Sequence, residues 1–215
     1  MSVEQRVQKH FDGDANRFDA IYRAEKGPLA RFVDNFWRGV VQKRLEINIQ
    51  CLEPLAGKSV LDIGCGSGRF CVAFAARGAR RVVGVDFAAS MIRLARENAR
   101  RSGVEDRCEF RLGSFPEAVS DGPFDASTAN GLFDYIEDPV PIIRRMRELT
   151  RETMMMSFPK AFEWRVPIRL IRFRMNGCPL FLYTAKRIYR ILLDAGITKV
   201  DCIELDRDYL IVAHL

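Results

Sequence analysis

The clearest chemical signal in the sequence is a glycine-rich run, residues 62–68, that reads Asp-Ile-Gly-Cys-Gly-Ser-Gly. The residues 59–63 predict a short buried strand that ends in this run. Glycines at a tight strand-to-helix turn let the backbone approach a ligand closely. A second carboxylate, Asp86, ends the next predicted strand, where an acid can accept both hydroxyls of an adenosine ribose. Together, the run and the acid predict a nucleotide site.

The elements that must position these residues alternate between helix and strand after Pro54. We expect strands at 59–63, 81–85, 107–112, 124–129, 153–158, 198–205 and 208–213, and helices at 69–77, 90–101, from 139, and 184–195. Such alternation predicts an α/β fold with a doubly wound, mostly parallel sheet and helices on both faces. Ligands bind such sheets at the carboxyl ends of the strands, where the winding reverses.

The N-terminal part is predicted to be helical. Gly27-Pro28 opens a helix whose apolar residues recur from Leu29 to Leu45, so that one face is buried. Pro54 and Gly57 then break the chain. We therefore expect an N-terminal helical cap over 1–53, which forms a lid, and one larger domain over 54–215.

Composition narrows the class of protein. The chain has 215 residues, of which 48 % are hydrophobic and 29 % charged, as in a globular protein. No apolar run approaches the ~20 residues of a membrane span, and the N-terminus has no apolar signal-peptide core. Six cysteines form no Cys-x-x-Cys pair, and the two histidines, His10 and His214, lie at opposite ends. We expect no metal site, no disulfide framework and a cytoplasmic location.

The positive charge is concentrated in one segment. The net charge is +6, but Arg144 to Arg190 carries twelve basic and three acidic residues. Within it, an insertion at about 159–180 alternates apolar residues with Arg165, Arg169, Arg172 and Arg174. This mixture predicts a roof over an acceptor site, suited to an anionic, partly apolar acceptor or to peripheral association with an anionic membrane. A solvated arginine-rich face is the alternative.

The glycine spacing separates two nucleotide classes. A dinucleotide fingerprint would place its third glycine at position 69, which is Arg69. The form Asp-x-Gly-x-Gly-x-Gly, with Asp86 after the second strand, resembles the class I S-adenosylmethionine (SAM)-dependent methyltransferases. The resemblance covers Lys58 to Leu215. It implies a Rossmann-like, seven-stranded sheet with an antiparallel final hairpin, SAM as cofactor and S-adenosylhomocysteine (SAH) as product.

The same resemblance implies roles for individual residues. Asp62 would orient the amino group of SAM, Asp86 would accept the ribose hydroxyls, and Asn130 would line the methyl-transfer cleft. The full candidate set for cofactor binding is Asp62, Gly64, Cys65, Gly66, Gly68, Asp86, Phe87, Met91, Ser114, Phe115 and Asn130. Phe87 and Met91 would lie along the adenine, with core packing as the alternative for both. Ser114 and Phe115 follow Gly113, where the family often has a Gly-Asp pair.

The residues after the fourth strand bear on the acceptor. Asn130-Gly131-Leu132-Phe133 differs from the Asn/Asp-Pro-Pro-aromatic turn of nucleobase N-methyltransferases. A cysteine that attacks C6 of a pyrimidine would need a preceding proline, and no cysteine of this chain follows a proline. Methyl transfer to an oxygen of a small molecule is therefore favoured. The layout is distantly similar to magnesium-protoporphyrin and ubiquinone-type O-methyltransferases, which often place a histidine where this chain has Tyr135. Tyr135, and second Tyr22, are candidate catalytic residues that would position the acceptor, with packing as the alternative.

The sequence also permits three other functions. A nicotinamide-dependent reductase is disfavoured because Tyr183 and Lys186 are one residue too close for a Tyr-x-x-x-Lys pair. A nucleic-acid methyltransferase is suggested by the basic segment, which has no RNA-binding signature. A non-catalytic SAM-binding protein is the third, and the sequence does not predict the oligomeric state.

Overall fold

The computed structural model describes residues 41–163, 166–167, 170, 173 and 178–215. Seven strands form one sheet in the order β3-β2-β1-β4-β5-β7-β6. The strands are β1 (Ser59–Ile63), β2 (Arg81–Asp86), β3 (Cys108–Leu112), β4 (Phe124–Ala129), β5 (Thr150–Pro159), β6 (Val200–Glu204) and β7 (Asp208–His214). The part of the cap before residue 41, including Tyr22, lies outside the described residues.

The strand directions confirm the predicted doubly wound sheet. The five strands β3, β2, β1, β4 and β5 are parallel, and β7 runs antiparallel to both β5 and β6. From β1 the chain winds outward to β2 and β3, and it then returns to place β4 on the other side of β1. The winding therefore reverses between β1 and β4, where such sheets bind ligands.

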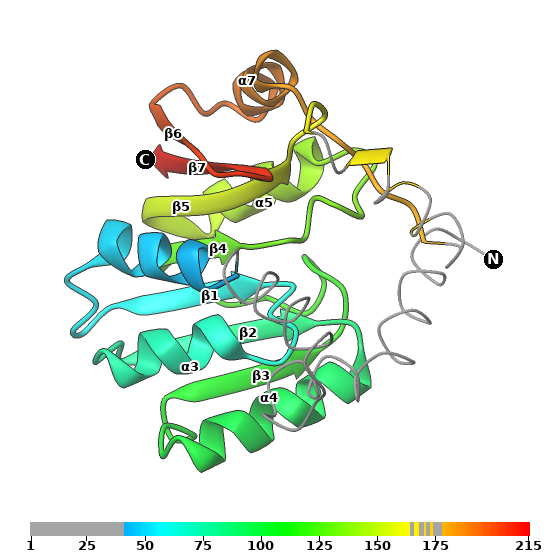
Figure 1. Cartoon of the computed structure of the whole chain (residues 1–215). Coiled ribbons are helices and arrows are strands. Elements are labelled where there is room, and N and C mark those ends of the chain that lie inside the picture. The colour runs from blue at the N-terminus through cyan, green and yellow to red at the C-terminus, as the bar shows by residue number, and fades with distance from the viewer. Residues whose placement is uncertain (1–40, 164–165, 168–169, 171–172, 174–177) are drawn as a thin grey trace.

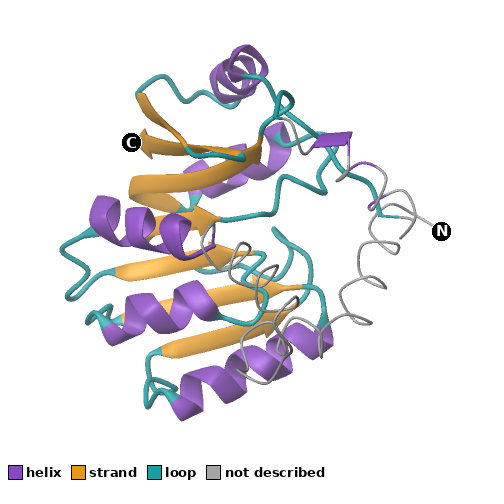
Figure 2. Cartoon of the chain, in the orientation of Figure 1, coloured by secondary structure: helices purple, strands orange, loops and turns teal. Residues whose placement is uncertain are grey.

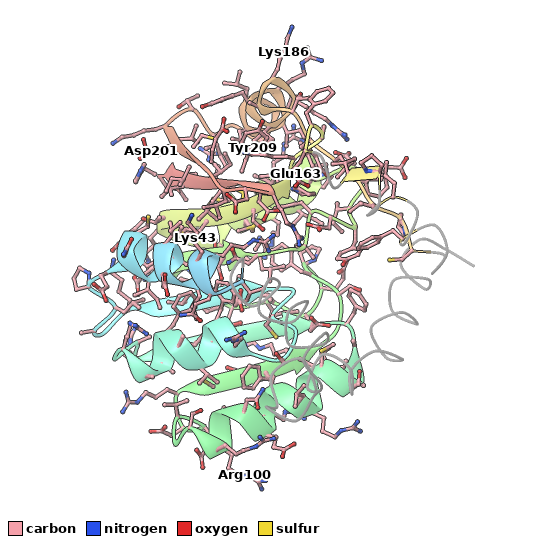
Figure 3. All side chains as sticks on the ribbon, in the orientation of Figure 1. Lys43, Arg100, Glu163, Lys186, Asp201 and Tyr209 are labelled. Carbon is pink, nitrogen blue, oxygen red and sulfur yellow. The ribbon has the colours of Figure 1, made fainter. Side chains whose placement is uncertain are left out.

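Helices cover both faces of the sheet (Figure 2). They are α3 (Arg69–Ala76), α4 (Ala89–Arg101), α5 (Val140–Glu148) and α7 (Ala185–Asp194). One buried cluster joins α3 and α4 to one face of the sheet, and a second joins α5 and α7 to the other. Arg100 on α4 and Lys186 on α7 lie at opposite ends of the molecule (Figure 3). The crossover 113–123 contains no helix, as its Gly113, Pro116 and Gly122 predict.

The described part of the N-terminal segment is a helix over 41–52, which packs beside α3 (Figure 1). It extends beyond Leu45, the last apolar residue of the predicted pattern. Leu45, Ile49 and Leu52 are buried in the same cluster as α3 and α4, and they recur at helical spacing. This helix, which we assigned to the cap, therefore shares a hydrophobic core with the larger domain.

Candidate active site

The glycine-rich run forms the turn between β1 and α3. Gly64, Gly66 and Gly68 have φ values of 69°, 51° and 72°, a region that favours glycine. A Cβ on Gly68 would lie 2.8 Å from the Cβ of Ala95 and 2.9 Å from the ring of Phe110. A Cβ on Gly66 would meet no described residue within 4 Å. Gly68 thus allows close packing against α4 and β3, whereas no described residue crowds the backbone at Gly66.

Asp86 fastens this turn to the end of β2. One carboxylate oxygen, Oδ2, accepts a hydrogen bond from the backbone N–H of Gly66 at 2.9 Å, and Oδ1 accepts from the N–H of Ala88 at 2.9 Å. The carbonyl of Val85 accepts from the N–H groups of Gly64 and Cys65 at 2.8 and 3.0 Å. The two sequence motifs therefore meet at the carboxyl ends of β1 and β2.

Asp62 lies beneath the turn with its carboxylate buried. Thr128 on β4 donates its hydroxyl to Oδ1 at 2.6 Å, and the Cys71 thiol on α3 donates to Oδ2 at 3.4 Å. Burial raises the pKa of Asp62 to about 6, although both hydrogen bonds act in the opposite direction. The hydrogen bonds of this carboxylate therefore tie β1 to β4 and α3.

Cys65 is also buried. Its Sγ and that of Cys71 would each lie 2.9 Å from a Cβ on Gly84, so both thiols pack against β2 at that glycine. The thiol of Cys65 donates weakly to the carbonyl of Gly66 at 3.7 Å. The side chain of Cys65 thus points into the core, and only its backbone belongs to the surface of the turn.

The candidates for the adenine side gather after β2 and β3. Met91 is buried and forms a small separate cluster with Ala88 and the half-buried Phe87. The N–H of Gly113 donates to the carbonyl of Asp86 at 3.0 Å, which brings the half-buried Ser114 near the end of β2. Phe115, in contrast, packs against the cluster on the α5 face.

A polar network that the sequence did not predict surrounds Asn130 at the end of β4. Asn48, on the helix 41–52, exchanges two side-chain hydrogen bonds with Asn130. One turn earlier, Arg44 donates two hydrogen bonds to the buried carboxylate of Asp208. Burial acts to lower the pKa of Arg44, but the charges of Asp208 and Asp134 outweigh it and hold that pKa above its ordinary value. In the sequence, this network is indicated only by Arg44 and Asn48, two polar residues on the otherwise apolar face of this helix.

The two tyrosines near the end of β4 differ in environment. Tyr135 is half-buried, and its ring centroid lies 6.0 Å from that of Phe173. Tyr183 is fully buried and donates its hydroxyl to the carbonyls of Phe133 and Ile136 at 3.2 and 3.0 Å. Burial raises the pKa of Tyr183 to about 12. Tyr183 therefore fixes the loop after β4, which is inconsistent with a role as the acid of a reductase.

The basic segment is partly engaged in contacts within the protein. Lys160 binds Glu204 at 3.0 Å and lies 5.0 Å from the centroid of the Tyr209 ring. Arg144 donates to the carbonyl of Asp194, which ends α7. The four arginines that motivated the predicted roof, Arg165, Arg169, Arg172 and Arg174, lie outside the described residues.

Within the described residues, no three His, Cys, Asp or Glu side chains are grouped so that they could hold a metal ion. None of the helices in this part of the chain is long and apolar enough to cross a membrane.

Comparison with known proteins agrees with this fold. A family described as "Methyltransferase domain" matches residues 55–164, which is about half of the chain. The chain belongs to this family, within the class I SAM-dependent methyltransferases, and SAM is the methyl donor of that class. The predictions of family and fold are thus confirmed.

Individual relatives are similar over different lengths. The ubiquinone biosynthesis O-methyltransferase of Neisseria meningitidis serogroup A is 31% identical over 154 residues, 65% of this chain and 64% of the relative. The ribosomal protein L11 methyltransferase of Alteromonas mediterranea is 52% identical over 58 residues, 27% of this chain and 20% of the relative. The chain thus spans less than two thirds of the length of either.

One solved structure is similar over nearly the whole chain. Magnesium protoporphyrin IX methyltransferase from Synechocystis PCC 6803 with bound SAH has a TM-score of 0.78 and 19% identity, and the match covers 98% of this chain and 99% of that one. This likeness confirms the fold, including the antiparallel final hairpin.

Proposed function

We propose that this protein transfers a methyl group from SAM to an oxygen of a small-molecule acceptor. The observation that carries the proposal is the contact between Asp86 and the N–H of Gly66, at the point where the winding of the sheet reverses. It places an acid that can accept ribose hydroxyls beside a glycine whose Cβ position no described residue occupies. The chemistry and space of this turn fit an adenosine ligand.

The remaining cofactor contacts follow from that placement. The backbone of 64–68 would lie against the methionine and ribose portions, Phe87 and Met91 would flank the adenine, and Ser114 would replace the usual carboxylate near the adenine amino group. Asp62, which lies beneath the turn, would help to orient the amino group of SAM by holding the turn in place. SAM supplies an activated methyl group on sulfur, so the protein has to hold the acceptor in line with it. Asn130 and Tyr135, after β4, are the residues that we assign to that task.

Several observations support a small molecule as the acceptor. The names of two relatives, the ubiquinone O-methyltransferase and the magnesium protoporphyrin methyltransferase, favour a small molecule. The residues after β4 do not match the nucleobase pattern. An anionic, partly apolar acceptor would suit the basic insertion at 159–180, and the helical segment before residue 54 would cover the site.

Protein methylation is the second candidate, since the L11 methyltransferases share up to 52% identity with this chain. That match spans only 20% of the relative, however. It therefore supports a shared methyltransferase segment and gives no independent support for a shared acceptor. A nucleic-acid methyltransferase and a non-catalytic SAM-binding protein remain as outcomes of the test.

The test combines binding and transfer. Calorimetry with SAH and with NADH should show binding of SAH alone, and SAH should raise the melting temperature, because ligand at about a hundredfold excess over Kd stabilises the native state by ~2.7 kcal/mol. Radiolabelled SAM would then be offered with catechol, magnesium protoporphyrin IX, protein L11 or RNA. Label in either of the first two supports the proposal. Binding of NADH but not SAH, or label only in protein or RNA, would overturn it.

A further inference from the structure

The side-chain amides of Asn48 and Asn130 form a reciprocal pair between the helix 41–52 and the end of β4. Nδ2 of Asn130 donates to Oδ1 of Asn48 at 3.1 Å, and Nδ2 of Asn48 donates to Oδ1 of Asn130 at 3.3 Å. Asn48 is 0% exposed, whereas Asn130 is half-buried. One end of the pair is therefore enclosed by the protein, and the other end reaches the edge of the sheet where the candidate site lies.

The main chain sets the orientation of this pair. The Nδ2 of Asn48 also donates to the carbonyl oxygen of Arg44 at 2.8 Å. Because a carbonyl only accepts hydrogen bonds, a flipped Asn48 would place two oxygens against each other and lose this bond. With Asn48 fixed, Asn130 must turn an N–H toward the Asn48 oxygen. The helix thus decides which atom of Asn130 donates and which accepts.

The side-chain amide of Asn130 has more hydrogen-bonding groups than its contact with Asn48 uses. An amide side chain has two N–H groups and an oxygen with two lone pairs. Asn48 uses both N–H groups within the protein. Among the described residues, Asn130 uses one N–H and one lone pair on Asn48, so one donor and one acceptor have no partner in this part of the chain. These are the groups with which an amide can hold a hydroxyl or a carboxylate oxygen.

The surroundings hold this helix firmly at the site. Arg44 is anchored by its two hydrogen bonds to Asp208, and its Nη1 lies 3.4 Å from where a Cβ on Gly131 would stand. The N–H of Gly131 donates to the hydroxyl of Ser157 at 2.8 Å, which fixes the main chain next to Asn130. Both partners of the amide pair therefore sit on braced backbone.

We propose that Asn48 is a positioning residue for methyl transfer. It holds the amide of Asn130 in the one orientation in which the remaining N–H and oxygen contact the reacting group of the acceptor. Asn48 itself touches neither acceptor nor cofactor. This inference rests on the function proposed above, because it assigns Asn130 to the acceptor.

The first experiment observes the amide directly. Nitrogen-15 NMR would follow hydrogen exchange of the Asn130 side-chain amide in the wild type, in Asn48→Ala and in Asn48→Leu. The leucine variant preserves the side-chain volume and replaces the alanine variant if that variant unfolds. The matched control is Ile49→Ala, which loses only apolar packing on the same helix. We expect exchange at least about tenfold faster in the Asn48 variants than in the control. Equal exchange in all variants would overturn the proposal.

The second experiment measures the consequence for transfer, with catechol or magnesium protoporphyrin IX as acceptor. Asn48→Leu should lower kcat about tenfold or more and leave the Kd for SAH within about twofold, because a misplaced acceptor costs rate rather than cofactor affinity. Asn48→Leu/Asn130→Ala should be no slower than Asn130→Ala alone. A kcat equal to that of Ile49→Ala would refute positioning. A wild type that does not bind SAH would instead refute the proposed function, while the exchange experiment would still judge the amide pair.

Discussion

Arg44 and Asp208 form a buried ion pair between the helix 41–52 and the first residue of β7. Nε and Nη2 of Arg44 both donate to Oδ2 of Asp208, although 164 residues separate the two in sequence. The side chains are 9% and 0% exposed. The final hairpin, which is remote in sequence from the glycine-rich turn, is thereby joined to the helix that contacts Asn130.

The first prediction concerns the stability of this pair. Arg44→Met should lower the free energy of unfolding by about 3–5 kcal/mol, because it leaves the Asp208 carboxylate buried without its partner. Adding Asp208→Leu should recover part of the loss. The control is Arg145→Met, which breaks an exposed pair with Glu148 and should cost no more than about 1 kcal/mol. Urea unfolding measures all three, and a similar cost for both single variants would contradict the prediction.

The second prediction concerns the cofactor. Asp86→Ala should weaken SAH binding by about 1.5–3 kcal/mol, the range for hydrogen bonds to a charged group. The variant also removes the acceptor for the N–H of Gly66, so the turn itself should loosen. Calorimetry with SAH measures the effect, and Asp106→Ala, an exposed carboxylate on another turn, is the control. Wild-type affinity in Asp86→Ala would exclude a role in ribose binding.

The third prediction is a pH dependence caused by Asp62. Its pKa of about 6 exceeds the ordinary value of 3.8, so the native state binds more protons than the unfolded chain between these pH values. The contribution of Asp62 to stability is therefore present below pH ~4 and is lost as pH rises through about 6. The total change is at most about 3 kcal/mol.

Asp62→Asn tests this sign. The variant should remove that part of the pH dependence and gain stability relative to the wild type as pH rises from about 4 to 8. Its amide oxygen can still accept the hydroxyl of Thr128. Urea unfolding across this pH range would measure the difference. A constant difference between variant and wild type would show that Asp62 does not titrate in this way.

The sequence predicted the parts of the fold that local pattern determines. The bounds of β1 and β4 agree with the prediction, because each strand is a compact run between glycine or proline breaks. The predicted start of β5, at residue 153, lies three residues after its observed start at Thr150. Arg151 and Glu152 are exposed and paired with Asp125 and Lys58, so this first part of the strand has the polarity of a loop.

The polar network around Asn130 was not predictable for a different reason. Asn48 and Asn130 are 82 residues apart, and their contact depends on how the helix 41–52 packs against β4. On the helix, Arg44 and Asn48 interrupt an apolar face, but nothing local indicates whether such residues are solvated or paired. In contrast, the glycine spacing and Asp86 were informative because both carry their chemistry within one strand-turn unit.

The last prediction concerns Tyr135, which lies in the loop after β4 with its backbone N–H bonded to the carbonyl of Leu132 at 3.1 Å. The phenol is half-buried and belongs to the loop that begins at Asn130, at the end of β4. If its hydroxyl holds the acceptor oxygen, Tyr135→Phe should lower kcat about tenfold, equivalent to ~1.4 kcal/mol or one hydrogen bond, with the Kd for SAH unchanged. The ring contact with Phe173 would survive the change. Tyr189→Phe, on the exposed side of α7, is the matched control and should retain wild-type kcat. Wild-type kcat in Tyr135→Phe as well would reduce Tyr135 to packing and leave Asn130 as the residue that positions the acceptor.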